Sequence, residues 1–401
     1  MLGFPCACRE IVRQALAWLL AACGRTASPS DSAYCQARGR LSLTWLQEIQ
    51  GLIAAKLQAA CRPEHHWFGR QVFLVDGATA SMPDTPANQA VFPQIRRQKP
   101  GCGFPLVRLV AAFSLATGAM LELAWDAFRV AERTLFHRLW ERFPPGAVVV
   151  ADRGFCGLAD FWLLAQRGVD CVMRRTGRRS VGVLLVRQIN PHDRWVLWRK
   201  ARQPVRWLDR AAWDAIPAAL LVREIRVVVE IPGFRTNILT IATTLLDEQK
   251  YPTAAFADLY RRRWLAELFL RDIKITTGMD ALTCKSPAMV EKEITMHVIV
   301  YNLLRALMFQ AAVEHDVDPF RLSFKGAVAT VVQWTPLVHH PIEVAAVLAQ
   351  LRRILAADQL PHRPNRVEPR ARKRRPKNYQ LLNRPRCEFH EIIHRNKYRK
   401  A

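Results

Sequence analysis

The sequence lacks the cysteine and histidine spacings of a structural metal site. Its 401 residues include ten cysteines, but there is no CxxC pair and no Cys/His cluster with zinc spacing, so a zinc-stabilised fold is not expected. Cys6 and Cys8 form one CxC, and the other eight cysteines are scattered along the chain. The simplest interpretation is that the cysteines are reduced, mostly buried thiols in a cytosolic protein.

The sequence also lacks a clear secretory signal or membrane span near its start. The candidate there is QALAWLLAACG at residues 14–24, where residues 20–23 resemble a lipoprotein processing site. Glu10 and Arg13 stand close to it, and an apolar stretch of only about ten residues is too short for a membrane span. We interpret this segment as an amphipathic core helix.

Acidic residues are few compared with basic ones. The chain has 34 Asp or Glu and 59 Lys or Arg, a net charge of +25, which predicts a polyanionic partner. Residues 361–401 alone contain 14 Lys or Arg and 3 Glu. Nucleic acid is the favoured partner because Lys and Arg release counterions from phosphates. A membrane surface is the weaker alternative, since this tail has no clear amphipathic pattern.

Hydrophobic periodicity predicts a folded α/β protein with no internal repeat. Half of the residues are hydrophobic, and 401 residues suffice for two or three domains. Helices are expected at 9–23, 41–60, 130–142 and 158–167, with a turn at 26–32 (TASPSDS). Strands are expected at 71–77, 105–115, 119–128, 147–152, 170–175 and 236–245. Ser286 and Pro287 predict the start of a long helix that reaches about residue 311.

One segment, YRRRWLAELFLRDIK at 260–274, carries a charged stripe on an otherwise apolar helix. At about 100° per residue, Tyr260, Arg263, Glu267 and Lys274 fall within an arc of roughly 60°. A carboxylate among cations and a phenol could hold a metal ion against a phosphodiester. The alternative is a surface helix with an ordinary Arg263–Glu267 ion pair. However, a helix that is apolar nearly all round is expected to be buried, and a charged stripe on it then needs a reason.

Two further acids end predicted buried strands, Asp76 in LVDG and Asp152 in VVVADRG. Metal-dependent phosphoryl transfer needs carboxylates that converge on two divalent cations about 3.5–4 Å apart, and Mg²⁺ takes oxygen ligands. Asp76, Asp152 and Glu267 are therefore candidate metal ligands. An Asp before a Gly, or near one, is also a common turn residue. Spacing alone does not exclude five competing acids, which are Asp84, Glu122, Asp126, Glu291 and Glu293.

Three segments resemble the three blocks of bacterial DDE transposases of the insertion-sequence-four group. They are VFLVDGATASMPDTPANQAVFPQ, VVVADRGFCG and YRRRWLAELFLRDIKITTGMDAL, and the third matches that group's spacing of Tyr, Arg, Glu and Lys without departure. The similarity runs from about residue 36 to the tail. It implies a ribonuclease-H-like, mixed-sheet α/β core in which Asp76, Asp152 and Glu267 bind two Mg²⁺ ions, with Mn²⁺ as a substitute. It also implies that Tyr260, Arg263 and Lys274 contact DNA phosphate.

The resemblance implies five regions. These are an N-terminal helical DNA-binding domain (1–68), a first part of the catalytic core (69–175), a β-rich insertion (176–234), a second part of the core (235–320), and a C-terminal helical region with a basic tail (321–401). Members of the group can form a DNA hairpin in which an aromatic residue of the insertion stacks on a flipped base. Four tryptophans are candidates for this role, namely Trp195, Trp198, Trp207 and Trp213, although packing is the commoner role for any one of them.

The function implied is that of an insertion-sequence transposase in the bacterial cytoplasm, associated with the nucleoid. It would bind terminal inverted repeats in double-stranded DNA, hydrolyse a phosphodiester at each 3′ end and join the freed ends to target DNA, acting as a homodimer in the synaptic complex. Two alternatives remain, a catalytically decayed or domesticated DNA-binding protein and a stand-alone ribonuclease-H-like nuclease.

Overall fold

The computed structural model describes residues 8–28, 30–176, 182–228, 238–334 and 344–361, together with residues 382, 384, 385 and 388. Nearly all of the predicted basic tail and both ends of the predicted insertion, 177–181 and 229–234, lie outside the described residues.

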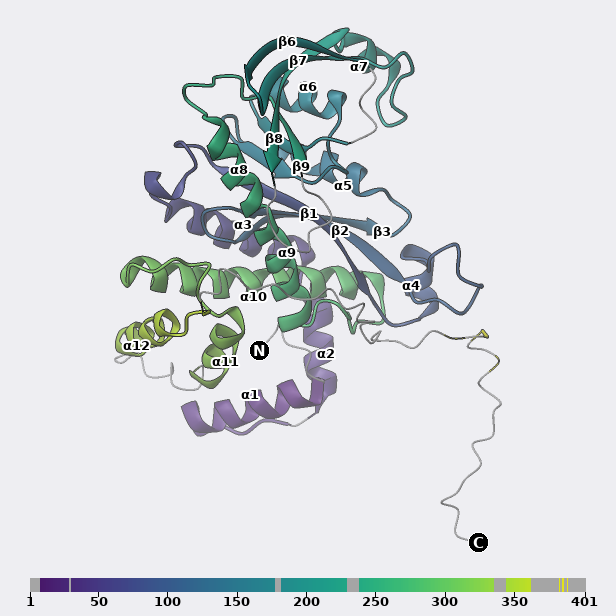
Figure 1. The fold of residues 1–401 in the computed structure, drawn as a ribbon. Coiled ribbons are helices and arrows are strands. Elements are labelled where there is room, and N and C mark those ends of the chain that lie inside the picture. The colour runs from purple at the N-terminus through teal and green to yellow at the C-terminus, as the bar shows by residue number, and fades with distance from the viewer. Residues whose placement is uncertain are drawn as a thin grey trace.

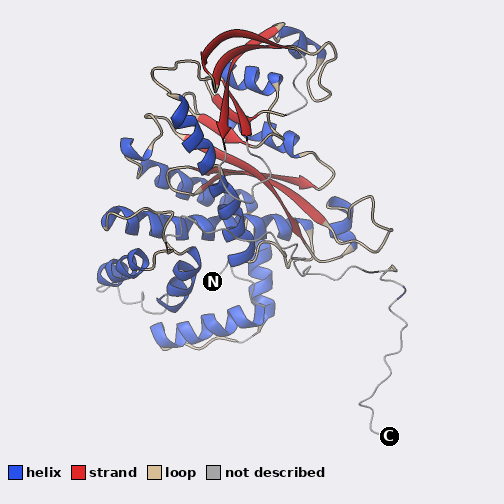
Figure 2. Ribbon diagram, viewed as in Figure 1, coloured by secondary structure: helices blue, strands red, loops and turns tan. Residues whose placement is uncertain are grey.

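The described chain is built on one large mixed sheet with the strand order β3-β2-β1-β4-β5-β9-β8-β7-β6 (Figures 1 and 2). β1 pairs antiparallel with β2 and parallel with β4, which in turn is parallel to β5. The first five strands in this order are β1 (Val72–Ser81), β2 (Leu106–Ser114), β3 (Met120–Ala127), β4 (Val148–Ala151) and β5 (Asp170–Arg174). The mixed α/β architecture expected from the sequence is confirmed.

Helices cover both faces of the sheet, because alternate residues of each strand face opposite sides. On β1, Val72 and Leu74 pack into one hydrophobic cluster, and Phe73 and Val75 pack into the other. The first face is covered by α8 (Thr253–Arg262), α9 (Trp264–Arg271) and α10 (Pro287–Glu314). The second is covered by α3 (Leu43–Ala59), α5 (Glu132–Leu139) and α6 (Leu158–Gln166).

The longest helix, α10, begins at Pro287 as the sequence predicted. By length and composition it could cross a membrane, but 61% of its most apolar window is buried inside the protein. It packs against α3 and against α12 (Val344–Ala357), while α11 (Phe324–Trp334) packs on α12. A core helix of this kind has the same apolar composition as a membrane span.

The segment predicted as an insertion contributes strands to the same sheet. β6 (Val183–Asn190), β7 (Asp193–Arg199) and β8 (Ala219–Val228) are antiparallel to one another, with α7 (Arg210–Ala215) before β8. They join the rest of the sheet through β9 (Ile238–Thr243), which pairs with both β8 and β5. The β-rich character matches the expectation, whereas the division into five regions stays a prediction.

Among the N-terminal helices, one was not predicted and one was described wrongly. α2 (Asp31–Arg40) was not predicted; it begins at the end of the turn-like segment 26–32, where the Ser30 side chain accepts a hydrogen bond from Ser32 N. This helix has no buried residue, so it leaves no apolar periodicity in the sequence. α1 (Cys8–Cys23) is a helix as predicted but not a core helix. Leu20 is 55% exposed, and only Val12 is buried among the side chains that the structure describes there.

The structure describes the side chains of seven cysteines, and most of them are buried, as expected. Cys102, Cys156, Cys171 and Cys284 are buried, Cys61 is half-buried, and Cys23 and Cys35 are exposed.

Candidate active site

The strand register places Asp76 and Asp152 at the same level on neighbouring strands. Val75 of β1 pairs with Ala151, the last residue of β4, so each acid is the next residue along its strand. Asp76 comes two residues after Leu74, and Asp152 comes two residues after Val150. Because alternate residues of a strand face the same side, the two acids face the side on which Leu74 and Val150 pack, which α8 and α9 cover. Since neighbouring strands lie about 4.8 Å apart, the two carboxyl groups emerge side by side beneath α8 and α9.

The turn interpretation is wrong for Asp76 and correct in part for Asp152. Asp76 lies inside β1, which continues to Ser81. A Cβ on Gly77 would lie 2.8 Å from the Glu132 carboxyl carbon, so this glycine allows close packing of α5 rather than a turn. Asp152 does open a turn, because its carbonyl oxygen accepts a hydrogen bond from Phe155 N at 3.1 Å.

The helix that carries the charged stripe is not continuous, contrary to the expectation from its spacing. α8 ends at Arg262, α9 begins at Trp264, and a π-helical turn follows at Asp272–Thr276. A π-turn is wider than a turn of α-helix and interrupts its regular spacing. Lys274 lies within this turn, and its Nζ is 2.8 Å from the carboxylate of Asp280.

Arg263 ties the remaining members of the stripe to the strand acids. Its Nη2 donates a hydrogen bond to Glu267 Oε1 at 2.7 Å, and its Nη1 lies 3.8 Å from Asp76 Oδ2. Its guanidinium carbon is 5.8 Å from the centre of the Tyr260 ring. Burial alone would lower the pKa of Arg263, but the hydrogen bond to Glu267 and the nearby Tyr260 and Asp76 outweigh it, and the net pKa is raised. The guanidinium is therefore a permanent positive charge among these carboxylates.

The electrostatics of Asp76 show that the three candidate acids share one environment. The pKa of Asp76 is raised to about 6, chiefly by burial; the Gly77 N–H and Arg263 act to lower it, and Glu267 and Asp152 act to raise it. Burial also raises the pKa of the Tyr260 phenol, with Asp152 acting in the same direction. Asp76, Asp152, Glu267, Arg263 and Tyr260 thus act on one another across β1, β4, α8 and α9.

We expect the metal-free protein to lose stability as Asp76 ionises. The unfolded chain holds this group at an ordinary pKa near 4, so the folded protein binds the extra proton between about pH 4 and 6. The free energy of unfolding should therefore fall by about 2–3 kcal/mol as the pH rises through this window. Urea denaturation in EDTA checks this, with Asp76→Asn as the variant that should lack this component. Identical pH profiles for the two proteins would contradict it.

The residues fit a divalent cation in chemistry, although their present arrangement is held by Arg263. Three carboxylates supply the hard oxygen donors that Mg²⁺ and Mn²⁺ prefer, and the desolvated Asp76 gains most from a nearby positive charge. Within the described ranges, no three Asp, Glu, His or Cys residues stand close enough to ligate one ion as they are. Arg263 instead occupies the space between Asp76 and Glu267 as their counter-ion.

Two residues at this site were missed in the sequence. Arg174 ends β5 one residue beyond Met173, which pairs with Ala151, so it is level with Asp152, and its charge lowers the pKa of Tyr260. The sequence feature that could have identified Arg174 is its place as a basic residue at the end of a third predicted buried strand. Trp264 follows Arg263 and is 54% exposed. Its exposure contradicts the expectation of a fully buried helix, and the apolar sequence around it gave no sign of this.

The other residues raised from the sequence lie away from this cluster. Trp198 and Trp213 of the predicted insertion are buried, and Trp198 Nε1 donates to Glu224, so neither presents a free ring face. The competing acids sit elsewhere in the fold. Asp84 follows β1, Glu122 and Asp126 are on β3, and Glu291 and Glu293 are on α10.

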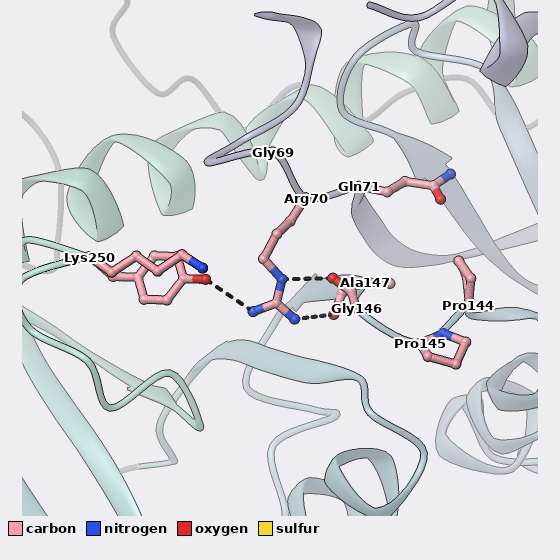
Figure 3. Close-up of a pocket in the computed structure, with 9 residues that line it drawn as sticks. Gly69, Arg70, Gln71, Pro144, Pro145, Gly146, Ala147 and Lys250 are labelled. Carbon is pink, nitrogen blue, oxygen red and sulfur yellow. Dashed lines mark hydrogen bonds between the residues drawn. The ribbon is translucent and has the colours of Figure 1, made fainter. Parts of the chain in front are cut away.

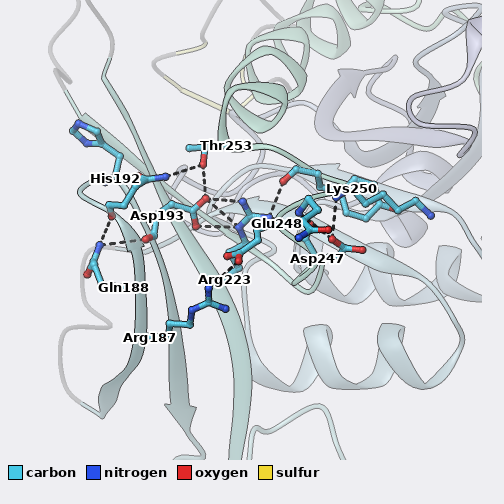
Figure 4. A network of polar contacts seen from close by, with 12 residues as sticks. Arg187, Gln188, His192, Asp193, Arg223, Asp247, Glu248, Lys250 and Thr253 are labelled. Atoms are coloured by element: carbon cyan, nitrogen blue, oxygen red, sulfur yellow. Dashed lines mark hydrogen bonds and ion pairs between the residues drawn. The ribbon is translucent and has the colours of Figure 1, made fainter.

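A buried ion pair links the insertion strands to the start of α8 (Figure 4). Asp193 of β7 accepts from Arg223 of β8 at 2.6 Å, and both side chains are at most 1% exposed. Asp193 also accepts from Thr253, the first residue of α8, at 2.6 Å, and Arg223 donates to the Tyr251 carbonyl at 2.8 Å. These bonds position the helix that carries Tyr260.

A cavity of about 380 Å³ lies at the opposite ends of β1 and β4 (Figure 3). Arg70 on its wall donates to the carbonyls of Gly146 and Ala147 and pairs with Asp170 at 2.6 Å. The two parallel strands both start at this cavity. Asp76 and Asp152 lie toward the other end of the paired residues, so the cavity is remote from them.

Residues 67–303, more than half of the chain, match the family described as Transposase DDE domain. The chain is 26% identical over 358 residues to Transposase InsG for insertion sequence element IS4 of Escherichia coli (strain K12), covering 87% of this chain and 78% of that protein. It is 26% identical over 143 residues to Putative transposase InsZ of the same organism, covering 35% of this chain and 47% of that protein. Among solved structures, a cryo-EM structure of the piggyBac transposase synaptic complex with hairpin DNA aligns with a TM-score of 0.40 and 7% identity, over 71% of this chain and 57% of that one. The family match spans both strand acids and Glu267, confirms the resemblance carried by the three motifs, and shows that the chain belongs to the transposase DDE domain family.

Proposed function

We propose that this transposase serves an insertion sequence, binds the terminal inverted repeats of its element, cleaves a phosphodiester at each 3′ end and joins the freed ends to target DNA. The observation that carries the proposal is the convergence of Asp76, Asp152 and Glu267 around Arg263 on one face of the sheet. We further propose that β1 to β5 form a ribonuclease-H-like core. The parallel pairing of β1 with β4, which places Asp76 and Asp152 at the same level, supports this proposal.

Asp76, Asp152 and Glu267 would hold two Mg²⁺ ions, with Mn²⁺ as a substitute. When bound, such ions activate the attacking oxygen and stabilise the leaving one. The protein's own contribution is to fix Asp76 inside a strand, Asp152 directly after one and Glu267 on a packed helix, since strands and helices hold side chains more rigidly than loops do.

Arg263, Tyr260 and Arg174 would bind the phosphate that is cleaved. Arg263 offers a guanidinium fork suited to phosphate, and Tyr260 presents a neutral hydroxyl that can donate a hydrogen bond. Arg263 is bound to Glu267 without DNA, so an entering phosphate would take over part of its hydrogen bonding. Lys274 would contact phosphate farther along the DNA, since its partner Asp280 adjoins Ser81 at the end of β1.

The proposal is tested by cleavage of supercoiled plasmid that carries the DNA flanking the gene, with Mg²⁺, Mn²⁺ or EDTA. We expect nicking at the flanks that needs a divalent cation, because the acids alone provide no cation to balance phosphate charge. The complex with double-stranded end DNA should contain two copies of the chain, since two ends must be paired, and light scattering on the same sample checks this. This chemistry would take place on bacterial nucleoid DNA in the cytoplasm.

Salt-sensitive DNA binding without any metal-dependent cleavage would instead identify a decayed or domesticated DNA-binding protein. Cleavage of any duplex without preference for the flanks would identify a stand-alone nuclease.

A further inference from the structure

The loop between α4 (Pro86–Val91) and β2 presents a cluster of positive charge that the active site does not use. Its sequence is FPQIRRQKPGCGFP, residues 92–105, with no acidic residue. Arg96, Arg97 and Lys99 are exposed. We call residues 92–105 the basic loop.

Side-chain hydrogen bonds give the basic loop a defined shape. Gln94 lies at its centre, where its Nε2 donates to the carbonyls of Gln98 and Lys99 at 3.2 and 3.0 Å. Gln94 Oε1 accepts from Gly103 N at 3.0 Å. A Cβ on Gly103 would lie 2.7 Å from the Gln94 Cβ, so the glycine is needed for this closure. The three cations are held on a folded frame rather than on a free chain.

The basic loop lies beyond the end of the strand that carries Asp76. It leads into β2 at Leu106, which pairs with Ser81, the last residue of β1, and Figure 1 shows α4 at this end of the sheet. Ser81 comes five residues after Asp76 on β1, which is about 16 Å at roughly 3.3 Å per residue. That distance corresponds to about five base pairs of duplex. Lys274, near Ser81, lies between the two sites.

We propose that the basic loop binds the phosphate backbone of the duplex that is being cleaved, about half a helical turn or more from the reacting phosphate. This inference rests on the proposed function. Exposed Arg and Lys side chains recognise phosphate charge without reading sequence. The described tail residue Pro385 lies against the loop at Gly101, so this residue of the basic tail lies at the same place.

The test is the salt dependence of DNA binding by the Arg96→Gln/Arg97→Gln/Lys99→Gln variant in EDTA. Loss of three phosphate contacts should flatten the slope of log affinity against log salt by about 2 to 3. The matched control is Arg321→Gln/Lys325→Gln/Arg353→Gln, which removes equal charge from exposed positions just before α11, on α11 and on α12. These two helices lie at the left of Figure 1 and α4 lies at the right. Equal slopes for the two variants would overturn the proposal.

Duplexes truncated stepwise on either side of the mapped cleavage position locate the contact. The loop variant and the native chain should bind alike once fewer than about five base pairs remain on the side toward the loop. If end binding is unchanged and only joining to target DNA falls, the loop binds target DNA and the proposal is wrong. Gln94→Ala keeps the charges but removes the frame, and should also weaken binding; native affinity would contradict a role for the folded loop.

These outcomes are separable from failure of the proposed function. Binding is measured without metal, so a flattened slope supports the loop contact even if the native chain cuts no DNA. Conversely, metal-dependent cleavage by the native chain, with no change in the salt dependence of binding for the loop variant, would support the proposed transposase function and show that the basic loop does not contact the bound DNA.

Discussion

Replacing Asp152 with Asn is expected to lower metal-dependent DNA cleavage by at least ~10³-fold while DNA binding is retained. A bound divalent cation contributes several kcal/mol of charge stabilisation to phosphoryl transfer, and about 1.4 kcal/mol corresponds to a factor of ten in rate. Asn keeps the shape of the side chain but removes the negative charge that a metal ligand needs. Glu267→Gln should behave in the same way. The measurement is the rate of plasmid nicking, with binding followed separately in EDTA.

Asp126→Asn is the matched control for these variants. Asp126 is a partly exposed acid on β3 whose partner is Arg138 at 2.7 Å, so the same chemical change is made away from the cluster. Its nicking rate should stay close to that of the native chain. If Asp152→Asn or Glu267→Gln cleaves as fast as this control, the assignment of the triad is wrong.

Replacing Arg223 with Met is expected to lower the free energy of unfolding by about 3–5 kcal/mol. The substitution leaves the buried Asp193 carboxylate without its main cationic partner in an environment where both side chains are at most 1% exposed. It also removes the hydrogen bond to the Tyr251 carbonyl just before α8. Chemical denaturation of the purified protein measures the effect.

The double variant Asp193→Leu/Arg223→Met should recover part of the lost stability, because the uncompensated charge is gone. Arg187→Met is the control, since Arg187 pairs with Glu248 at 2.9 Å but its side chain is 54% exposed. Such an exposed pair contributes about 0–1 kcal/mol. A loss for Arg223→Met no larger than that of Arg187→Met would show that the buried pair does not hold the insertion to α8.

The strands that carry the acids could be predicted because burial leaves a strong signal. The runs that became β1, β4 and β5 are short, apolar and bounded by polar residues, and a strand buried on both faces must have this composition. The position of Asp76 relative to Asp152 could not be predicted in the same way. It depends on the register Val75 to Ala151, which is set by packing between distant segments.

The breaks in the helical segment 253–276 also could not be predicted from the sequence pattern. A uniform helix predicts Lys274 on the same stripe as Glu267, but a π-turn forms at Asp272–Thr276, and Lys274 pairs with Asp280. The buried Asp272 of this turn pairs with Arg305 of α10 at 2.7 Å, a tertiary contact that a local sequence pattern does not encode. Similarly, α2 escaped detection because it buries no side chain.

The continuity of the sheet through β9 has a mechanical consequence. Backbone hydrogen bonds run without interruption from the strands of the two aspartates to the edge strand β6. A hinge between the insertion and the acids would have to break the ladder between β5 and β9 and separate Asp193 from Thr253. Any DNA bound by β6, β7 or β8 would therefore be held in one frame with Asp76 and Asp152, and a motion that admits or releases that DNA would have to occur outside this frame.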